Sequence, residues 1–253
     1  MATTQAAVYV YGIVPADVEP EPHASGVGEP PGDVAVVRHG EIAALVSAVE
    51  SDQTLGTPDD LTAHARLLDG SATVAPVLPL RFGAVMTDTE AVENELLAAH
   101  EDEFRVALEE LEGRAQFVIS GRYVEDTILR ELLDENAEAA RLGEEIRGKP
   151  EDATRNARIA LGELINQAIE AKRNEDTRRV ISDLEELEPL VNQRQPTHEE
   201  DAVHIAILVE LARQGDLEET LRRIGQEWDG RVELSLLGPM AAYDFVTKRA
   251  PEE

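Results

Sequence analysis

The sequence contains no cysteine, which excludes disulfide bonds, thiolate nucleophiles and cysteine-ligated zinc or iron–sulfur centres. It also has no apolar run of about 18 residues, so we expect no membrane-spanning helix. No basic amino-terminal segment leads into a hydrophobic stretch, and we therefore expect no signal peptide. Together these absences predict a cytoplasmic protein without a membrane partner.

Basic residues are scarce in this chain. Only 23 lysines and arginines stand against 52 aspartates and glutamates, and the formal net charge is -29. Just three of the basic residues are lysines, namely Lys149, Lys172 and Lys248. Binding to phosphates requires clustered basic side chains, and the sequence has no basic stripe. We therefore expect no nucleic acid partner.

The acidic residues are spread along the whole chain rather than collected in a tail, so nearly every exposed face carries carboxylates. Their mutual repulsion destabilises a compact state in dilute buffer, whereas molar salt shortens the Debye length to about 3 Å. The composition therefore predicts a protein of a salt-loving cell. An ordinary acidic protein is the alternative, and its stability would not change between molar salt and dilute buffer.

The hydrophobic content of 42% is sufficient for a folded core, and the first part of the chain predicts an α+β domain over residues 1–113. Thr57 and Asp88 or Thr87 are the expected amino-terminal helix caps. An exposed loop of unusual length is expected over 15–32. The predicted strands are 7–14, 34–38, 41–49 and an irregular edge strand at 74–82, and the predicted helices are 58–70 and 88–112.

The second part of the chain predicts a carboxy-terminal α+β domain over residues 114–253. Strands are expected at 114–124, 202–211 and 231–237, with a helix at 216–228. A long helical hairpin at about 125–187 is inserted into this ferredoxin-like order of strands and helices, and a motif-bearing tail follows. The predicted fold class is thus α+β, with two domains of mostly antiparallel sheet and packed helices.

The second helix of the hairpin carries an apolar stripe at helical spacing, flanked by charged positions. Two interpretations stay open, since such a stripe is either part of the domain core or a face that binds a partner. The stripe consists of Ile159, Leu161, Leu164, Ile165, Ala168 and Ile169.

A search for catalytic or ligand-binding motifs gives no convincing site. His198 and His204 are six residues apart, whereas a helical zinc motif places two histidines four apart. Gly26 and Gly28 lack the third glycine and the strand-to-helix setting of a nucleotide loop. Ser120 lacks the flanking glycines of a nucleophile turn. We therefore predict no catalytic residue, no metal, no cofactor and no enzymatic activity.

Three separated segments carry a more specific signal. They are Tyr9–Val14 (YVYGIV), Val77–Gly83 (VLPLRFG) and Gly238–Val246 (GPMAAYDFV). In this order and at these separations, they resemble the gas vesicle protein GvpL/GvpF family, in a form suited to a salt-loving archaeon. The last segment departs from the family pattern, which has an aromatic residue and prolines where this chain has Met240-Ala241-Ala242.

Within these segments, Arg81, Phe82, Tyr243, Asp244 and Phe245 are the candidate motif or partner-binding residues. We expect Arg81 to form an ion pair with a carboxylate, and Asp244 is the proposed partner. Tyr243 and Phe245 require a surface against which to dock. The alternative is that these residues fix domain packing and contact no partner.

The resemblance implies an accessory protein of gas vesicle assembly. Such a protein binds the small hydrophobic shell subunit or other vesicle accessory proteins, either transiently or as a minor vesicle component, and stays cytoplasmic and vesicle-associated. A small-ligand-binding regulatory protein is the alternative function, and a carboxylate-dependent hydrolase is a third. A deep apolar pocket with convergent polar groups would favour ligand binding, whereas a shallow apolar patch would favour assembly.

Overall fold

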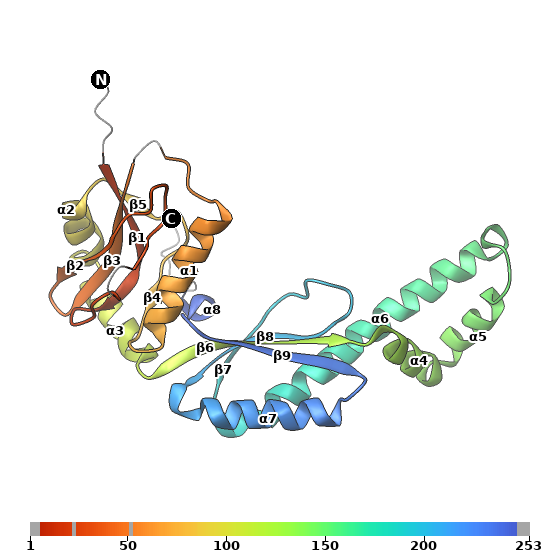
Figure 1. Cartoon of the computed structure of the whole chain (residues 1–253). Helices are drawn as coiled ribbons and strands as arrows, with labels where there is room; N and C mark the ends of the chain where they lie inside the picture. Colours follow the sequence, from red (N-terminus) through yellow and green to blue (C-terminus); the bar gives the residue numbers. More distant parts are fainter. Residues whose placement is uncertain (1–5, 22–23, 51–52, 247–253) are drawn as a thin grey trace. The chain divides into compact units, whose positions relative to one another are not determined.

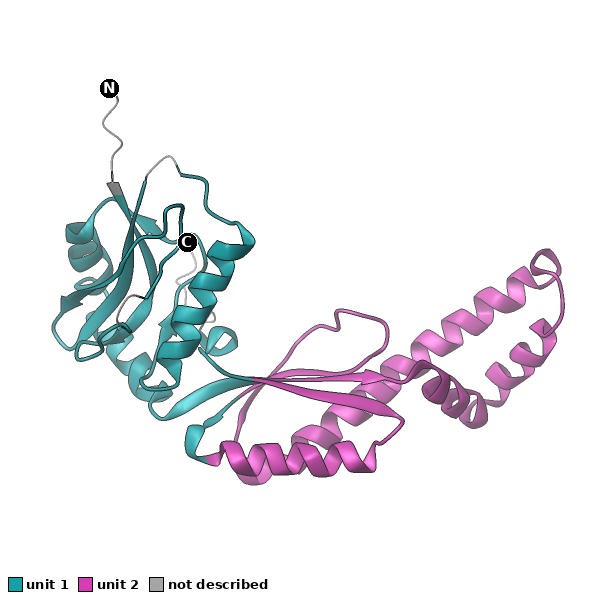
Figure 2. Cartoon of the chain, viewed as in Figure 1, with its two compact units in different colours: residues 1–117, 208–212, 238–253 teal, residues 118–207, 213–237 magenta. Residues whose placement is uncertain are grey.

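The computed structural model describes residues 6–21, 24–50 and 53–246 (Figure 1). The chain folds into two compact units (Figure 2). Unit 1 holds the described residues of 1–117, 208–212 and 238–253, and unit 2 holds 118–207 and 213–237. This grouping differs from the predicted domains 1–113 and 114–253, because the tail packs with the first half of the chain.

Unit 1 contains an antiparallel sheet with the strand order β2-β3-β1-β4, in which β5 also pairs with β1. The predicted strands at 7–14, 34–38 and 41–49 correspond to β1, β2 and β3, whereas only two residues of 74–82 form a strand. The strands are β1 (Ala6–Pro15), β2 (Val34–His39), β3 (Ile42–Glu50), β4 (Leu78–Pro79) and β5 (Val85–Met86).

Helices cover both faces of this sheet. On one face α1 (Pro58–Ala72) buries Leu68 and Ala72 against β1 and β3. On the other face lie α3 (Glu101–Leu111) and the short helices α2 (Thr89–Ala91) and α8 (Tyr243–Val246). The predicted start of α1 is confirmed, because Thr57 and Asp60 form a reciprocal capping box and proline occupies the first turn.

The prediction of one continuous helix over 88–112 is wrong. Asp88 does cap the first turn, but a π-helical segment η1 (Val92–Leu97) follows, and His100 separates it from α3. Val92 and Leu97 are five residues apart and both fully buried. In an α-helix, side chains five residues apart point about 140° away from each other, whereas a π-helical turn places them on the same face. The need to bury both side chains accounts for the wider turn.

The second sheet is antiparallel and ferredoxin-like, with the strand order β7-β8-β6-β9, and the predicted α+β class is confirmed. β7 was not predicted, because its four residues give too short a pattern. The strands are β6 (Arg114–Tyr123), β7 (Leu190–Gln193), β8 (Asp201–Glu210) and β9 (Val232–Met240). The helices are α4 (Glu125–Glu135), α5 (Ala137–Ile146), α6 (Glu151–Asp183) and α7 (Gln214–Glu227), with short turns η2 (Glu185–Leu187) and η3 (Leu211–Arg213).

The helical hairpin lies between β6 and β7 and consists of α4, α5 and α6. The first arm of the predicted hairpin is divided at Asn136, whose side chain accepts hydrogen bonds from the backbone N–H groups of Glu138 and Ala139 and so caps α5. Thr154 is the only residue buried in the part of α6 before Asp176. Among the described residues, no helix is both long enough and apolar enough to cross a membrane.

Candidate functional site

The three motif segments converge inside unit 1. Gly12 of β1 pairs with Pro79 of β4, and the backbone N–H of Gly83 donates to the Tyr9 hydroxyl over 3.1 Å. A Cβ on Gly12 would lie 2.7 Å from the carbonyl oxygen of Leu78, so the close approach of the two segments requires glycine there. The first two segments are therefore bound to each other through backbone and side-chain contacts.

A buried histidine links these segments to α1. The hydroxyl of Tyr9 lies 2.9 Å from Nδ1 of His64, and the Phe82 ring lies 5.5 Å from the His64 ring. Burial lowers the pKa of His64, while a hydrogen bond to the backbone of Leu80 opposes this shift. In the tautomer that donates to the carbonyl of Leu80, His64 Nδ1 is the acceptor for the hydroxyl of Tyr9.

The same burial keeps Tyr9 protonated. Desolvation raises the pKa of Tyr9 to about 12, although the hydrogen bond from Gly83 acts against the shift. Tyr9, His64 and Phe82 form what we call the aromatic clamp, in which all groups are neutral at pH 7. The clamp holds the segment 80–83 against α1.

A second buried group anchors the loop that precedes β2. Asp60 accepts hydrogen bonds from the backbone N–H groups of Gly28 at 2.8 Å, Gly56 at 3.0 Å and Thr57 at 3.0 Å. Burial alone would raise the pKa of Asp60, but these bonds outweigh burial and lower it. The expectation that 15–32 is an exposed loop is wrong in its middle, because Val27 is buried and donates its N–H to the hydroxyl of Tyr11.

The carboxy-terminal segment is tied to α1 and to the first residues of β6. The backbone N–H of Ala241 donates to Asp69 over 3.0 Å, and burial followed by the charge of Asp69 raises the pKa of Tyr243. The side chain of Gln116 donates to Asp244 over 2.6 Å, and Gln116 Oε1 accepts the backbone N–H of Asp244. Both partners of this reciprocal pair belong to unit 1.

The predicted ion pair between Arg81 and Asp244 is wrong. Arg81 is exposed and makes no hydrogen bond or ion pair with another described residue, while Asp244 binds Gln116. Phe82 lies half-buried in the aromatic clamp, and Tyr243 and Phe245 are half-buried against the two core clusters of unit 1. A role of these residues in binding a partner stays a prediction.

Sequence reasoning missed His64, Asp69 and Gln116. Only His64 left a signal, because it lies four residues before Leu68 on the buried face of α1. The partners of Asp69 and Gln116 are more than a hundred residues away along the chain, which no local pattern reveals.

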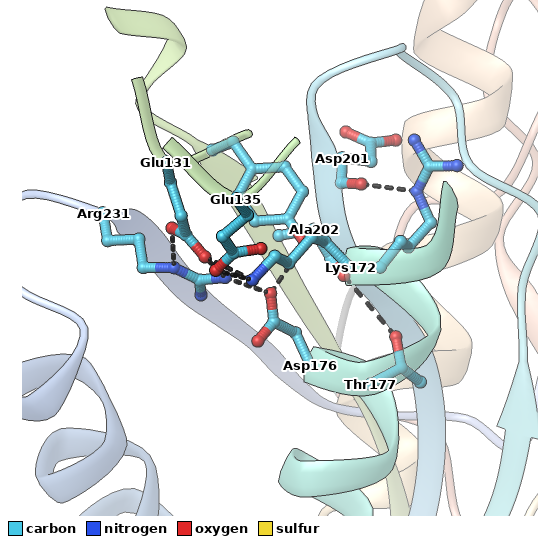
Figure 3. A network of polar contacts seen from close by, with 10 residues as sticks. Glu131, Glu135, Lys172, Asp176, Thr177, Asp201, Ala202 and Arg231 are labelled. Atoms are coloured by element: carbon cyan, nitrogen blue, oxygen red, sulfur yellow. Dashed lines mark hydrogen bonds and ion pairs between the residues drawn. The ribbon is translucent and has the colours of Figure 1, made fainter. Parts of the chain in front are cut away.

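A network of ionic contacts fixes the base of the helical hairpin in unit 2 (Figure 3). Lys172 of α6 binds Glu131 and Glu135 of α4 at 2.7 and 2.8 Å. Arg231 binds Glu131 at 2.8 Å and Asp176 at 2.9 Å. Burial would raise the pKa of Glu131, but Arg231 and Lys172 outweigh it and lower the pKa. One of the three lysines thus serves a partly buried network, which salt screens less than it screens fully exposed ion pairs.

A hollow of about 770 Å³ in unit 1 lies between α1 and the loop before β2. Among the described residues that line it, four carboxylates stand against one cation, Arg66. The described residues also contain no group of three or more histidines, aspartates or glutamates placed to hold a metal. This hollow is therefore not the deep apolar pocket with convergent polar groups that would favour a regulatory ligand.

The chain is an α+β protein with two antiparallel sheets, one of them ferredoxin-like. Its three motif segments are held together by packing and hydrogen bonds. Residues 7–247 match the family model described as "Gas vesicle synthesis protein GvpL/GvpF". This chain belongs to that family, which links it to gas vesicle formation and is not known for enzymatic activity.

Two similar proteins are named gas vesicle protein F. "Gas vesicle protein F" of Streptomyces sp. (strain CB03234) is 28% identical, covering 94% of this chain and 98% of the relative. The protein of that name from Dolichospermum flosaquae is 24% identical over 94% and 96%. The organisms of these relatives do not test the expectation of a salt-loving host, which stays a prediction.

Solved structures support the fold. The crystal structure of GvpF from Anabaena sp. PCC7120 matches with a TM-score of 0.78 at 21% identity, covering 95% of this chain and 98% of that one. GvpF from Microcystis aeruginosa matches with a TM-score of 0.74 at 20% identity, covering 96% and 99%. The two-sheet architecture is therefore that of known gas vesicle proteins.

Proposed function

We propose that this protein is a non-enzymatic accessory factor of gas vesicle assembly that binds the small hydrophobic shell subunit, with or without other accessory proteins. Family membership supports a role in vesicle formation. The observation that carries the finer proposal is the apolar stripe of α6, which is not part of a buried core. Ile159 is 53% exposed, and Leu161, Leu164 and Ile169 are only half-buried.

Ile159 is an exposed aliphatic side chain beside these partly covered neighbours, and such a row is a candidate contact surface on a chain with a net charge of -29. It fits a partner whose own surface is apolar, in the manner of a helix packed into a groove. The acidic remainder of the surface carries hydrated carboxylates and so helps to keep a bound aggregation-prone subunit in solution. We further propose that the protein acts in a cytoplasm of high salt, at or near the vesicle.

Co-purification tests the proposal. Tagged protein and shell subunit are produced together, and the subunit retained in molar salt is quantified for the native chain, for Leu164→Glu and for the matched control Asn166→Glu on the exposed face of the same helix. We expect retention by the native chain and by Asn166→Glu, and loss with Leu164→Glu. A folded native chain that retains no shell subunit contradicts the proposal.

A further inference from the structure

The second sheet leaves one long strand with an open edge. Among the described residues, β9 pairs with β6 alone, because it ends the order β7-β8-β6-β9. The carbonyl oxygen of Arg231 accepts the N–H of Val124 at the start of this pairing. Along an antiparallel strand, alternate residues point their backbone N–H and C=O groups toward the partner strand and away from it. The backbone groups of Leu234 and Leu236 therefore point away from β6. Residues 232–237 contain one charge, Glu233, and no proline. Natural edge strands usually carry more protection against strand addition.

A partly apolar groove lies along this open edge. A hollow of about 580 Å³ lies between β9 and α7, which are neighbours in Figure 1. Leu221 of α7 and Leu234 and Leu236 of β9 line it, and all three belong to unit 2. A strand added at the edge would place every second side chain in this groove.

A glycine in the interior of α7 keeps the groove open. Gly225 lines the hollow, and a Cβ built there would meet no atom within 4 Å. Glycine inside a helix is less favourable than alanine, and neither packing nor a positive φ requires it at this position. The open space beside Gly225 leaves room in the groove for a side chain from outside the chain.

The charges around the groove define the chemistry of that occupant. Glu218, Asp229 and Glu233 contribute carboxylates to its lining, while the one cation, Arg222, is paired with Glu219. A second copy of this acidic chain would bring like charges together at the rim, whereas a basic segment would be attracted.

We propose that the groove between α7 and β9 binds an extended segment of a partner protein by strand addition, with alternate apolar side chains facing Leu234 and Leu236 and basic side chains at the rim. This goes beyond the proposed binding of the shell subunit, because it uses a different surface from the stripe of α6 and defines a different chemistry for the partner.

The probe is a blocked, dye-labelled seven-residue peptide alternating valine and arginine, titrated onto the full chain by fluorescence anisotropy. Gly225→Leu fills the groove, and Gly162→Leu is the matched control, because Gly162 also lies inside a helix with open space around its Cβ. Circular dichroism establishes folding of each variant. Leu236→Arg, which places a cation in the groove, is the second variant if Gly225→Leu does not fold.

We expect micromolar to submillimolar binding that Gly225→Leu or Leu236→Arg weakens at least tenfold and Gly162→Leu changes less than twofold. Hydrogen exchange of Leu234 and Leu236 amides should slow on binding. At the lowest salt that keeps the chain folded, a valine–glutamate peptide should bind at least fivefold more weakly. No binding by the native chain, or undiminished binding after filling the groove, overturns the proposal. Neither result affects the retention of shell subunit tested by Leu164→Glu.

Discussion

Replacing Tyr9 by phenylalanine removes one oxygen that joins two parts of the aromatic clamp. That hydroxyl lies 2.9 Å from His64 Nδ1 and 3.1 Å from the backbone nitrogen of Gly83. Each hydrogen bond contributes about 1 kcal/mol net to stability, and an unsatisfied buried acceptor costs about 1–3 kcal/mol. Gly83 is exposed, so water can replace its partner, whereas His64 is 95% buried. We therefore expect a loss of about 2 kcal/mol, within bounds of about 1–4 kcal/mol.

Urea denaturation followed by circular dichroism measures this loss as a lower midpoint at unchanged slope. The matching change in the melting temperature is about 2–4 °C for each kcal/mol in a chain of this size. A double-mutant cycle with His64→Phe isolates the contact itself, and we expect the two losses to be coupled by about 1 kcal/mol. Additive losses, or a loss below about 0.5 kcal/mol, would refute the hydrogen-bonded clamp.

The clamp also has a pH dependence of defined sign. Burial lowers the pKa of His64 in the folded state, so below about pH 6.5 the unfolded chain binds a proton that the folded chain rejects. The free energy of unfolding therefore falls as the pH drops below about 6.5, until the lowered pKa is reached. His64→Phe should remove this part of the pH dependence, and an unchanged pH profile would contradict a buried neutral histidine.

Three further substitutions test other contacts by urea denaturation. Lys172→Met leaves Glu131 with one cation and should lower the free energy of unfolding by about 1–3 kcal/mol, a range already reduced because the network is partly exposed. An unchanged free energy of unfolding would argue against a structural role of the network. Gly238→Ala places a Cβ 2.8 Å from the carbonyl oxygen of Gln116 at a φ of +134°, and should cost at least about 2 kcal/mol. Asp60→Ala removes the shared acceptor of three backbone N–H groups, of which water can reach those of the exposed residues Gly56 and Thr57, and should cost about 1–3 kcal/mol. It should also remove the part of the acid-induced loss of stability below about pH 3.9 that comes from Asp60.

Local chemistry explains which elements could be predicted from the sequence. Thr57 followed by Pro58 marks the start of α1, and the β-branched run around Val10 marks a buried strand. Three of the four strands of the ferredoxin-like order follow from such patterns, whereas the short β7 does not. The π-helical turn does not, because the burial of both Val92 and Leu97 is decided by the sheet beneath them.

The candidate site was only partly predictable, because its contacts join distant residues. The motif segments pointed to Phe82 and Tyr243, yet the groups that hold them, His64 and Asp69, lie on α1. Charge complementarity suggested the wrong partner for Asp244, since Gln116 has no charge. In a chain with so many carboxylates, the sequence provides no basis for choosing between possible pairs.

The central claim is that this protein assists gas vesicle formation without catalysis, and complementation of a gene deletion tests it most directly. Vesicles are scored in the host as pressure-sensitive light scattering. We predict that deletion abolishes or strongly reduces the signal, that the native gene restores it, and that Leu164→Glu, although folded and expressed, does not. Normal vesicles in the deletion strain, or full restoration by Leu164→Glu, would contradict the account.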